Sequence, residues 1–275
     1  MDAPGPVRLW HLSSLDAPTV AVVWTLAFAW AGGIQLPAWI PVLLALAAWS
    51  VYIADRLLDA RSALRVGNLD SLRERHLFHY RHRRVLLAIA VAAVCACLWI
   101  VFTKMPSIAR ERNSVLAVAA LAYFTSVHSS RRLTIFSISP LLKKELLVGL
   151  LFTAACALPA FTRAVQHSRG PLMAVAAYFA LLAWLNCHAI DRWEARDCSN
   201  GPQIVKSACL LVLIAVPLAL FLSTTNPRLA SLVLAGAAAA LLLALLDRRR
   251  AHLTPIALRA AADLALLTPL ALFLK

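Results

Sequence analysis

Apolar residues gather into long blocks along this chain, with charged segments between them. The blocks are about 16 to 20 residues long, which is the length that a helix needs to cross the hydrocarbon core of a bilayer. Hydrophobic residues make up 61% of the sequence and the mean hydropathy is +0.76, more than an ordinary soluble domain requires. We therefore expect an all-α polytopic membrane protein.

Nine blocks satisfy this criterion. We predict transmembrane helices at residues 18–34, 37–54, 85–103, 113–130, 146–162, 171–190, 207–225, 229–246 and 255–274. Four blocks begin at a proline, which suits the first turn of a helix because its backbone nitrogen needs no partner there. Residues 1–17 lack the basic start and apolar centre of a signal peptide, so we expect the first block to remain as a helix. Residues 1–275 thus form a single integral membrane domain, in which 1–17 is an N-terminal segment.

The net charge of +14 is distributed in a way that predicts topology. Most of the 27 lysines and arginines fall before the first block or after the even-numbered blocks. Under the positive-inside rule this places the N-terminus and those loops in the cytoplasm, with a bacterial inner membrane as the expected location. Because the cations lie in short loops and not on one soluble face, we expect no nucleic-acid partner. The six cysteines include no CxxC pair, so neither a disulfide framework nor a zinc site is expected.

Two acidic residues close the second apolar block, in the stretch VYIADRLLDA (51–60). If the helix continues past Ala54, Asp55 and Asp59 lie four residues apart on one face and are able to share a cation. They open the basic loop 55–84. The alternative is that the two carboxylates only balance neighbouring arginines at the water interface.

A second acidic stretch follows the sixth block, within the predicted loop 186–206. Asp191, Glu194 and Asp197 recur every third residue, and Asn186 lies just inside the block. DRLLDAR (55–61) resembles DRWEAR (191–196) if one residue is gapped, and four predicted helices separate them, which suggests two four-helix repeats plus a ninth helix. When Mg²⁺ bridges a protein and a diphosphate, it is coordinated by a few protein oxygens and several water molecules. We therefore expect magnesium ligands at Asp55, Asp59, Asp191, Glu194 and Asp197.

The acidic stretches also carry a family resemblance. VYIADRLLD resembles the first aspartate-rich motif of the UbiA-type intramembrane prenyltransferases, Asn-Asp-x-x-Asp-x-x-x-Asp, and Asp55 and Asp59 match its last two aspartates. NCHAIDRWEARD (186–197) is similar to the second motif of that family. The resemblance implies a UbiA-like nine-helix bundle, catalytic roles for Asp55, Asp59 and Asp191, and Mg²⁺ as cofactor. Val51 and Tyr52 stand where the family has Asn and Asp.

Basic residues near these motifs are candidates for binding a diphosphate, because a guanidinium can hold phosphate oxygens bidentately. The candidates are Arg56, Arg61, Arg73, Arg75, Arg81, Lys143, Lys144 and Arg192. The alternative is that these cations only anchor the loops to anionic lipid. His76, His79 and His82 follow one another at three-residue steps in RERHLFHYRHRR (73–84) and would share one helical face.

The function implied by the resemblance is magnesium-dependent transfer of an isoprenyl group from an isoprenyl diphosphate to an aromatic or lipid acceptor. The expected partners are that donor, membrane lipid and the acceptor. Two alternatives remain open: a catalytically degenerate relative that binds lipid or a partner, which Val51 and Tyr52 favour, and a small transporter. A transporter would more naturally carry charges deep in the bundle or broken helices, whereas nearly every charge here lies at the end of a block.

Overall fold

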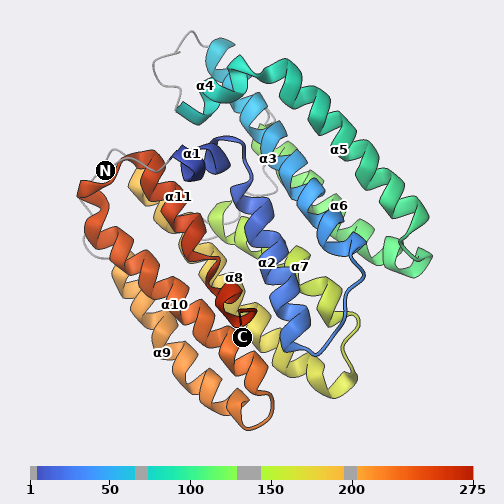
Figure 1. Ribbon diagram of the computed structural model, residues 1–275, viewed down its shortest axis with the longest axis vertical. Coiled ribbons are helices and arrows are strands. Elements are labelled where there is room, and N and C mark those ends of the chain that lie inside the picture. Colours follow the sequence, from blue (N-terminus) through green and yellow to red (C-terminus); the bar gives the residue numbers. More distant parts are fainter. Residues whose placement is uncertain (1–4, 66–73, 129–143, 195–202, 275) are drawn as a thin grey trace. The chain divides into compact units, whose positions relative to one another are not determined.

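The computed structural model describes residues 5–65, 74–128, 144–194 and 203–274, and the regular structure of these residues is entirely helical (Figure 1). The α-helices are α1 (Gly5–Leu12), α2 (Asp16–Ala31), α3 (Trp39–Arg65), α4 (Glu74–Arg81), α5 (Arg83–Thr103), α6 (Ser107–His128), α7 (Lys144–Phe161), α8 (Gln166–Glu194), α9 (Gln203–Ser223), α10 (Pro227–Arg249) and α11 (Pro255–Ala265). Two short 3₁₀ helices, η3 (Arg250–His252) and η4 (Thr268–Leu272), follow α10 and α11.

Each predicted apolar block overlaps a described helix, so the prediction of an all-helical fold is confirmed, although the last block, 255–274, is divided between α11 and η4. Two helices run beyond their predicted ends, α3 to Arg65 and α8 to Glu194, and so include the first acidic motif and part of the second. The sequence did not predict α1 as a helix of its own. Of the four expected starts at proline, that of α11 is observed: Pro255 follows Thr254, whose hydroxyl accepts from the backbone N–H of Ala257.

Six helical segments of the described chain are long and apolar enough to cross a membrane. They are Trp39–Ser62, Arg83–Thr103, Gln166–Glu194, Gln203–Ser223, Pro227–His252 and Pro255–Leu272. A seventh segment counts if α1 and α2, which meet at 89°, form one bent span. These helices are those of an integral membrane protein, and they do not confirm nine spans, since α6 is not among them and α7 offers only the shorter apolar stretch Glu145–Phe161.

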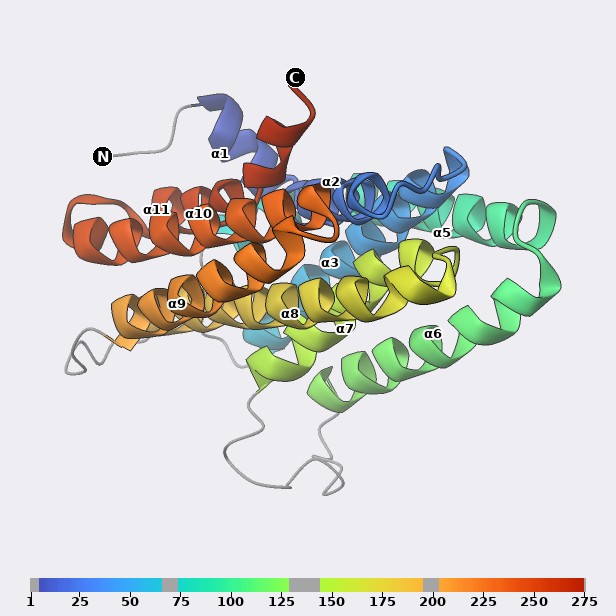
Figure 2. The same ribbon diagram turned by 90° about the horizontal axis from the view of Figure 1, so that it is seen from below.

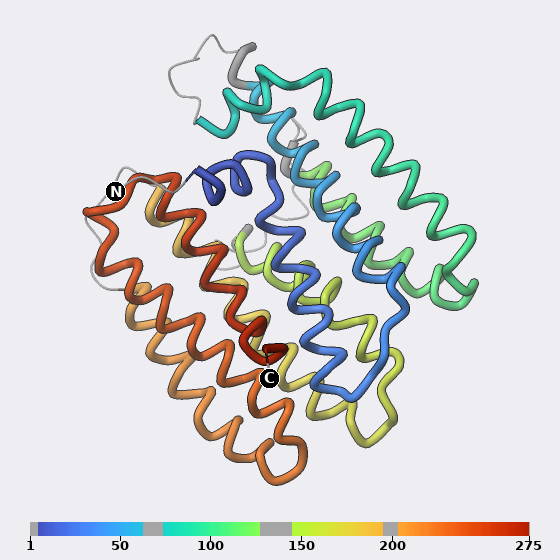
Figure 3. The backbone as a smooth tube through the Cα atoms, in the orientation of Figure 1, coloured from blue at the N-terminus to red at the C-terminus, as the bar shows by residue number. Residues whose placement is uncertain are grey.

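The chain divides into two compact units, and one of them comprises residues 9–19 and 38–140. In this unit α3 packs against α4 and α5 (Figure 3). The buried residues of α5 are Leu86, Ala93 and Ile100. Steps of seven residues are two helical turns, so only one narrow stripe of α5 faces protein. The other faces carry exposed apolar residues such as Val91 and Trp99, as expected of a helix that contacts lipid.

The other unit comprises residues 1–8, 20–37 and 141–275, and it is built mainly from α7 to α11 with the greater part of α2. Helices α9 and α10 form a hairpin, and α8 packs against both of them and against α7 (Figure 2). Trp24 stacks on Phe179 with ring centroids 3.8 Å apart, and its indole N–H donates to the carbonyl of Leu266 at 2.8 Å. At Gly236 of α10, an added Cβ would lie 2.8 Å from a ring carbon of Tyr178, so α8 and α10 approach closely there.

Candidate functional site

The first acidic motif lies on the C-terminal part of α3. Because α3 continues to Arg65 without interruption, Asp55 and Asp59 occupy positions i and i+4 of one helix, as predicted. The side chain of Asp59 is 47% exposed, and its Oδ2 lies 4.0 Å from Nε2 of His76 on α4. Asp55 is partly buried. This end of α3 therefore offers two carboxylates within one helical turn, with room for solvent at Asp59.

Arg56, between these two acids, points elsewhere. It is 3% exposed, and its Nη1 donates to the carbonyl oxygen of His11 at 3.1 Å and to Oγ of Ser14 at 2.6 Å. Its Nη2 lies 3.5 Å from Oδ2 of Asp16. This placement argues against the predicted role of Arg56 in diphosphate binding, because its guanidinium is already engaged by acceptors inside the protein.

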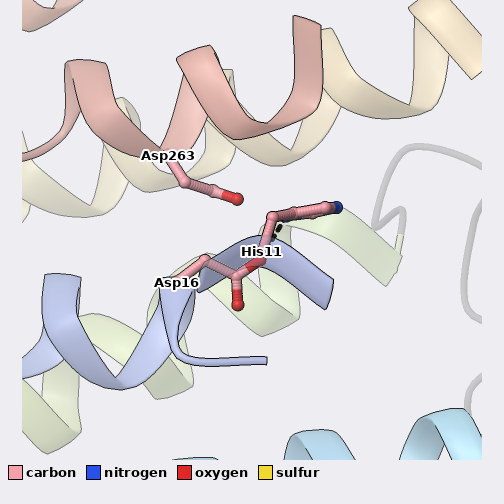
Figure 4. A group of neighbouring side chains, drawn as sticks. All are labelled: His11, Asp16 and Asp263. Carbon is pink, nitrogen blue, oxygen red and sulfur yellow. Dashed lines mark ion pairs between the residues drawn. The ribbon is translucent and has the colours of Figure 1, made fainter. Parts of the chain in front are cut away.

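These contacts belong to what we call the buried polar cluster: His11, Ser14, Asp16, Arg56 and His79, each at most 3% exposed. His11 Nδ1 and Asp16 Oδ2 are 2.7 Å apart (Figure 4). Ser14 has a φ of +61°, which costs a residue with a side chain about 1 kcal/mol or more. Its hydroxyl lies 3.0 Å from Nε2 of His79. The cluster thus ties the turn between α1 and α2 to α3 and α4.

The tautomer of His79 follows from its neighbours. Nδ1 lies 2.7 Å from the carbonyl oxygen of Arg75, which can only accept, so Nδ1 carries the proton and Nε2 accepts from the hydroxyl of Ser14. Burial lowers the pKa of His79 from 6.5 to about 4, and the positive charge of Arg56 acts in the same direction. His79 is therefore neutral at physiological pH and completes a directed chain of hydrogen bonds from Arg56 through Ser14 to the backbone of α4.

The second acidic motif lies at the end of α8, where the chain is described as far as Glu194. Asp191 is exposed. Glu194 accepts at Oε1 from Nη1 of Arg259, on α11, at 2.6 Å, so a cation already neutralises it. Asp197, the remaining predicted ligand, lies outside the described residues. Asp191 is thus the acid of this motif that the structure presents to solvent.

Asn186, one turn and a half before Asp191, is 5% exposed. Its Nδ2 donates to Oδ1 of Asp263 at 3.3 Å, and its buried Oδ1 has no hydrogen-bond partner within the described residues. A buried carbonyl oxygen without a partner costs about 1 to 3 kcal/mol. Asn186 therefore offers an oxygen that a cation or its bound water would satisfy.

Other polar contacts hold the end of α8 in place. The indole N–H of Trp193 donates to Oδ1 of Asp247 at 2.9 Å, and Nη1 of Arg250 reaches the same oxygen at 3.3 Å. Arg192, predicted to bind diphosphate, hydrogen-bonds the side chain of Gln203 at the start of α9. These bonds fix the second motif between α9 and α10.

The remaining predicted diphosphate ligands have varied positions. Arg61 and Arg81 are exposed on α3 and α4. Arg75 is partly buried on α4, and its Nε donates to Nε2 of His76 at 3.2 Å. Lys144 is the first residue of α7. Arg73 and Lys143 lie outside the described residues.

Carboxylate oxygens and a carboxamide oxygen are the hard donors that Mg²⁺ prefers, so the donor set of the two motifs fits this ion chemically. Among the residues described in either unit alone, no three His, Cys, Asp or Glu side chains bring ligand atoms within 4.8 Å of one another. Each motif therefore supplies too few protein ligands for a closed metal site. It suits an ion that keeps most of its water or takes oxygens from a substrate.

No protein-family model, no curated protein and no solved structure matches this chain. The likeness to UbiA-type prenyltransferases consequently rests on the sequence of the two acidic stretches and stays a prediction.

The buried polar cluster is the part of the molecule that sequence reasoning missed. Its members come from residues 11–16, from α3 and from α4, and their contacts depend on tertiary packing. Two signals were present: the polar run HLSSLD (11–16) before an apolar block, and His79 three residues from His76. Neither signal alone indicates which groups pair.

Proposed function

We propose that this chain is an intramembrane prenyltransferase of the UbiA type, which transfers an isoprenyl group from an isoprenyl diphosphate to an aromatic or lipid acceptor. In this proposal nine helices lie in the membrane, including α6, α7 and the bent pair α1 and α2. The N-terminus and both acidic motifs face the cytoplasm. The observation that carries the proposal is the continuation of α3 through Asp59 and of α8 through Glu194, which sets both motifs near the ends of helices long enough to span a bilayer.

Residue roles follow from the observed contacts. Asp55 and Asp59 in the first motif, and Asp191 in the second, are proposed as magnesium ligands. Glu194 is assigned instead to holding α11 through Arg259, since their 2.6 Å ion pair satisfies its charge. The exposed cations Arg61 and Arg81, with Arg75, are the candidates left on α3 and α4 for the diphosphate.

The proposed reaction separates charge as the diphosphate leaves, and these residues lower the free energy of that charge separation. The allylic carbon–oxygen bond breaks, its electron pair leaves with the diphosphate, and the allylic cation is taken by a nucleophilic atom of the acceptor, which then loses a proton. Magnesium, when bound, supplies neutralisation of the leaving diphosphate. The arginines would stabilise the same developing charge by donating hydrogen bonds to the diphosphate oxygens. The apolar helices exclude water, which would otherwise capture the cation.

A catalytically degenerate relative that binds lipid or a partner is the second candidate. The observation that favours it concerns Val51 and Tyr52, the first two residues of the first acidic motif. Val51 is 50% exposed, and Tyr52 lies with its ring 5.8 Å from the guanidinium carbon of Arg56. The family keeps an amide and a carboxylate at these positions, so the first motif here has fewer oxygen donors.

An assay of diphosphate release separates the two candidates. Purified protein in lipid nanodiscs is incubated with radiolabelled geranyl diphosphate, with Mg²⁺ or with EDTA, and both diphosphate release and donor binding are measured. We expect magnesium-dependent binding or release that Asp59→Asn and Asp191→Asn reduce by about 100-fold or more. Glu111→Gln, which removes an exposed acid of α6 outside both motifs, is the matched control and is expected to act as wild type. Donor binding and diphosphate release that do not change when Mg²⁺ is removed, or when either aspartate is replaced, would support the catalytically degenerate relative.

A further inference from the structure

An apolar groove of about 360 Å³ lies where α2 ends. Its walls are Leu26, Ala29, Trp30, Ile34, Leu36 and Phe273. The rings of Trp30 and Phe273 meet edge to face, with centroids 6.1 Å apart, and so form one side of the groove. All six residues belong to the unit of residues 20–37 and 141–275, and none of them takes part in the acidic motifs.

A cation lies directly beside this groove. The guanidinium carbon of Arg228 is 5.7 Å from the ring centroid of Trp30, within the range of a cation–π contact. Arg228 is exposed. The groove therefore has a positive charge next to its aromatic wall, and that charge remains open to a ligand from solvent.

Asn226 fixes this arrangement. Its Oδ1 accepts from the backbone N–H groups of Arg228 and Leu229 at 3.1 and 3.2 Å, which caps α10. Its Nδ2 donates to the carbonyl oxygen of Ala31, the last residue of α2, at 3.2 Å. One side chain thus holds the start of α10 against the end of α2, and Arg228 stays next to Trp30 for this reason.

The site combines a cation near one end of a candidate membrane span with an apolar groove, and these suit the headgroup and the acyl chain of a lipid. The apolar segment Pro227–His252 is long enough to span the membrane, and Arg228 is its second residue. When this segment spans a bilayer, the guanidinium is expected at the level of the phosphate groups. Tryptophan and arginine are typical of that level. The groove begins at Trp30 and is lined by apolar side chains, which suits a hydrocarbon chain.

We propose that the groove and Arg228 form a binding site for an anionic phospholipid, with an acyl chain in the groove and the headgroup phosphate on the guanidinium. The hydrogen-bond donors of the guanidinium favour a headgroup with net negative charge, because a zwitterionic headgroup brings its own cation to the same place. This lipid site does not depend on the proposed transferase activity.

Native mass spectrometry of the full chain tests the proposal. Protein in detergent is mixed with equal amounts of phosphatidylglycerol and phosphatidylcholine, and the retained lipid is measured. Wild type is expected to retain phosphatidylglycerol preferentially, and Arg228→Gln to weaken that retention about tenfold, the loss of one charge-assisted bond. Arg163→Gln removes another exposed arginine of the same unit, one that follows α7 and donates to the backbone carbonyl of Pro159 in that helix, and is expected to leave retention unchanged.

A second variant tests the groove itself. Leu26 lines it and is 39% exposed, so Leu26→Trp fills the groove at a position that tolerates a larger side chain. It is expected to reduce retention of phosphatidylglycerol while Arg228 stays in place. Equal retention of both lipids by wild type, retention unchanged in Arg228→Gln or in Leu26→Trp, or complete displacement by inorganic phosphate would overturn the proposal.

Discussion

Replacing Arg56 by methionine removes a buried side chain whose polar contacts the structure shows in full. The guanidinium donates to the carbonyl of His11 at 3.1 Å and to Oγ of Ser14 at 2.6 Å, and it lies 3.5 Å from the carboxylate of Asp16. The side chains of Arg56 and Asp16 are 4% and 2% exposed. Methionine preserves most of the volume and removes all three polar contacts. The carboxylate of Asp16 then remains buried without its guanidinium partner, although it keeps the contact with Nδ1 of His11 at 2.7 Å.

The cost follows from that buried carboxylate. Removing one partner of a buried ion pair costs about 3 to 5 kcal/mol, because the remaining charge stays desolvated. Since folded domains are stable by only about 5 to 15 kcal/mol, Arg56→Met removes a large share of the total. Arg56→Lys keeps the charge but not the planar fork, so about 1 to 2 kcal/mol is expected. Arg61→Met, at an exposed position of the same helix, is the matched control and should cost less than about 0.5 kcal/mol.

The assay is reversible unfolding in mixed micelles by increasing amounts of SDS, followed by circular dichroism. Asp16→Asn and the double variant complete a double-mutant cycle, in which we expect a coupling free energy of about 1 to 3 kcal/mol between Arg56 and Asp16. A loss for Arg56→Met no larger than that of Arg61→Met, or a cycle without coupling, would refute the assigned role of the buried polar cluster.

Three further predictions concern other parts of the molecule. Gly236→Ala should destabilise by about 1 kcal/mol or more in thermal unfolding because its Cβ meets a buried tyrosine ring, whereas Gly170→Ala, with no atom within 4 Å, should stabilise by up to about 1 kcal/mol. The pKa of His79 is about 4 in the folded protein against 6.5 when unfolded, so the unfolded chain takes up the proton first as the pH falls. The free energy of unfolding should therefore be greatest above about pH 6.5 and decline as the pH falls toward 4. Unfolding measured over a pH series should show a smaller decline in His79→Gln. Glu194→Gln should lower stability through lost pairing with Arg259 and leave magnesium-dependent diphosphate release near wild type, and loss of release would reassign Glu194 as a metal ligand.

Hydrophobic patterning predicted the helices well, because a long apolar run in lipid must satisfy its own backbone and a helix does so locally. The same patterning was less informative about spans. The first turns of α6 carry Arg110, Glu111 and Arg112, and α6 is not among the described helices that are apolar enough to cross a membrane. The second apolar block of the sequence ends at Ala54, but the helix that contains it, α3, continues to Arg65. Helical hydrogen bonding does not stop where the apolar residues end.

Side-chain partners could not be predicted in the same way. Asp55 and Asp59 share a helix as expected, since their spacing alone decides this. The use of Arg56 inside the protein depends on the turn at residues 13–15, where Ser14 adopts a positive φ that no sequence rule assigns to serine. Similarly, Arg259 reaches Glu194 on another helix, 65 residues earlier in the chain, a contact that arises only from packing.

The acidic motifs are proposed to bind magnesium together with a diphosphate. Mn²⁺ replaces Mg²⁺ at oxygen ligands, so electron paramagnetic resonance of free Mn²⁺ reports its binding to the protein in nanodiscs directly. We expect geranyl diphosphate to strengthen Mn²⁺ binding to wild type, and Asp59→Asn and Asp191→Asn each to abolish this gain while Glu111→Gln preserves it. Mn²⁺ binding that is the same with and without geranyl diphosphate, or a gain that survives in both aspartate variants, would show that the acidic motifs do not bind metal and diphosphate together.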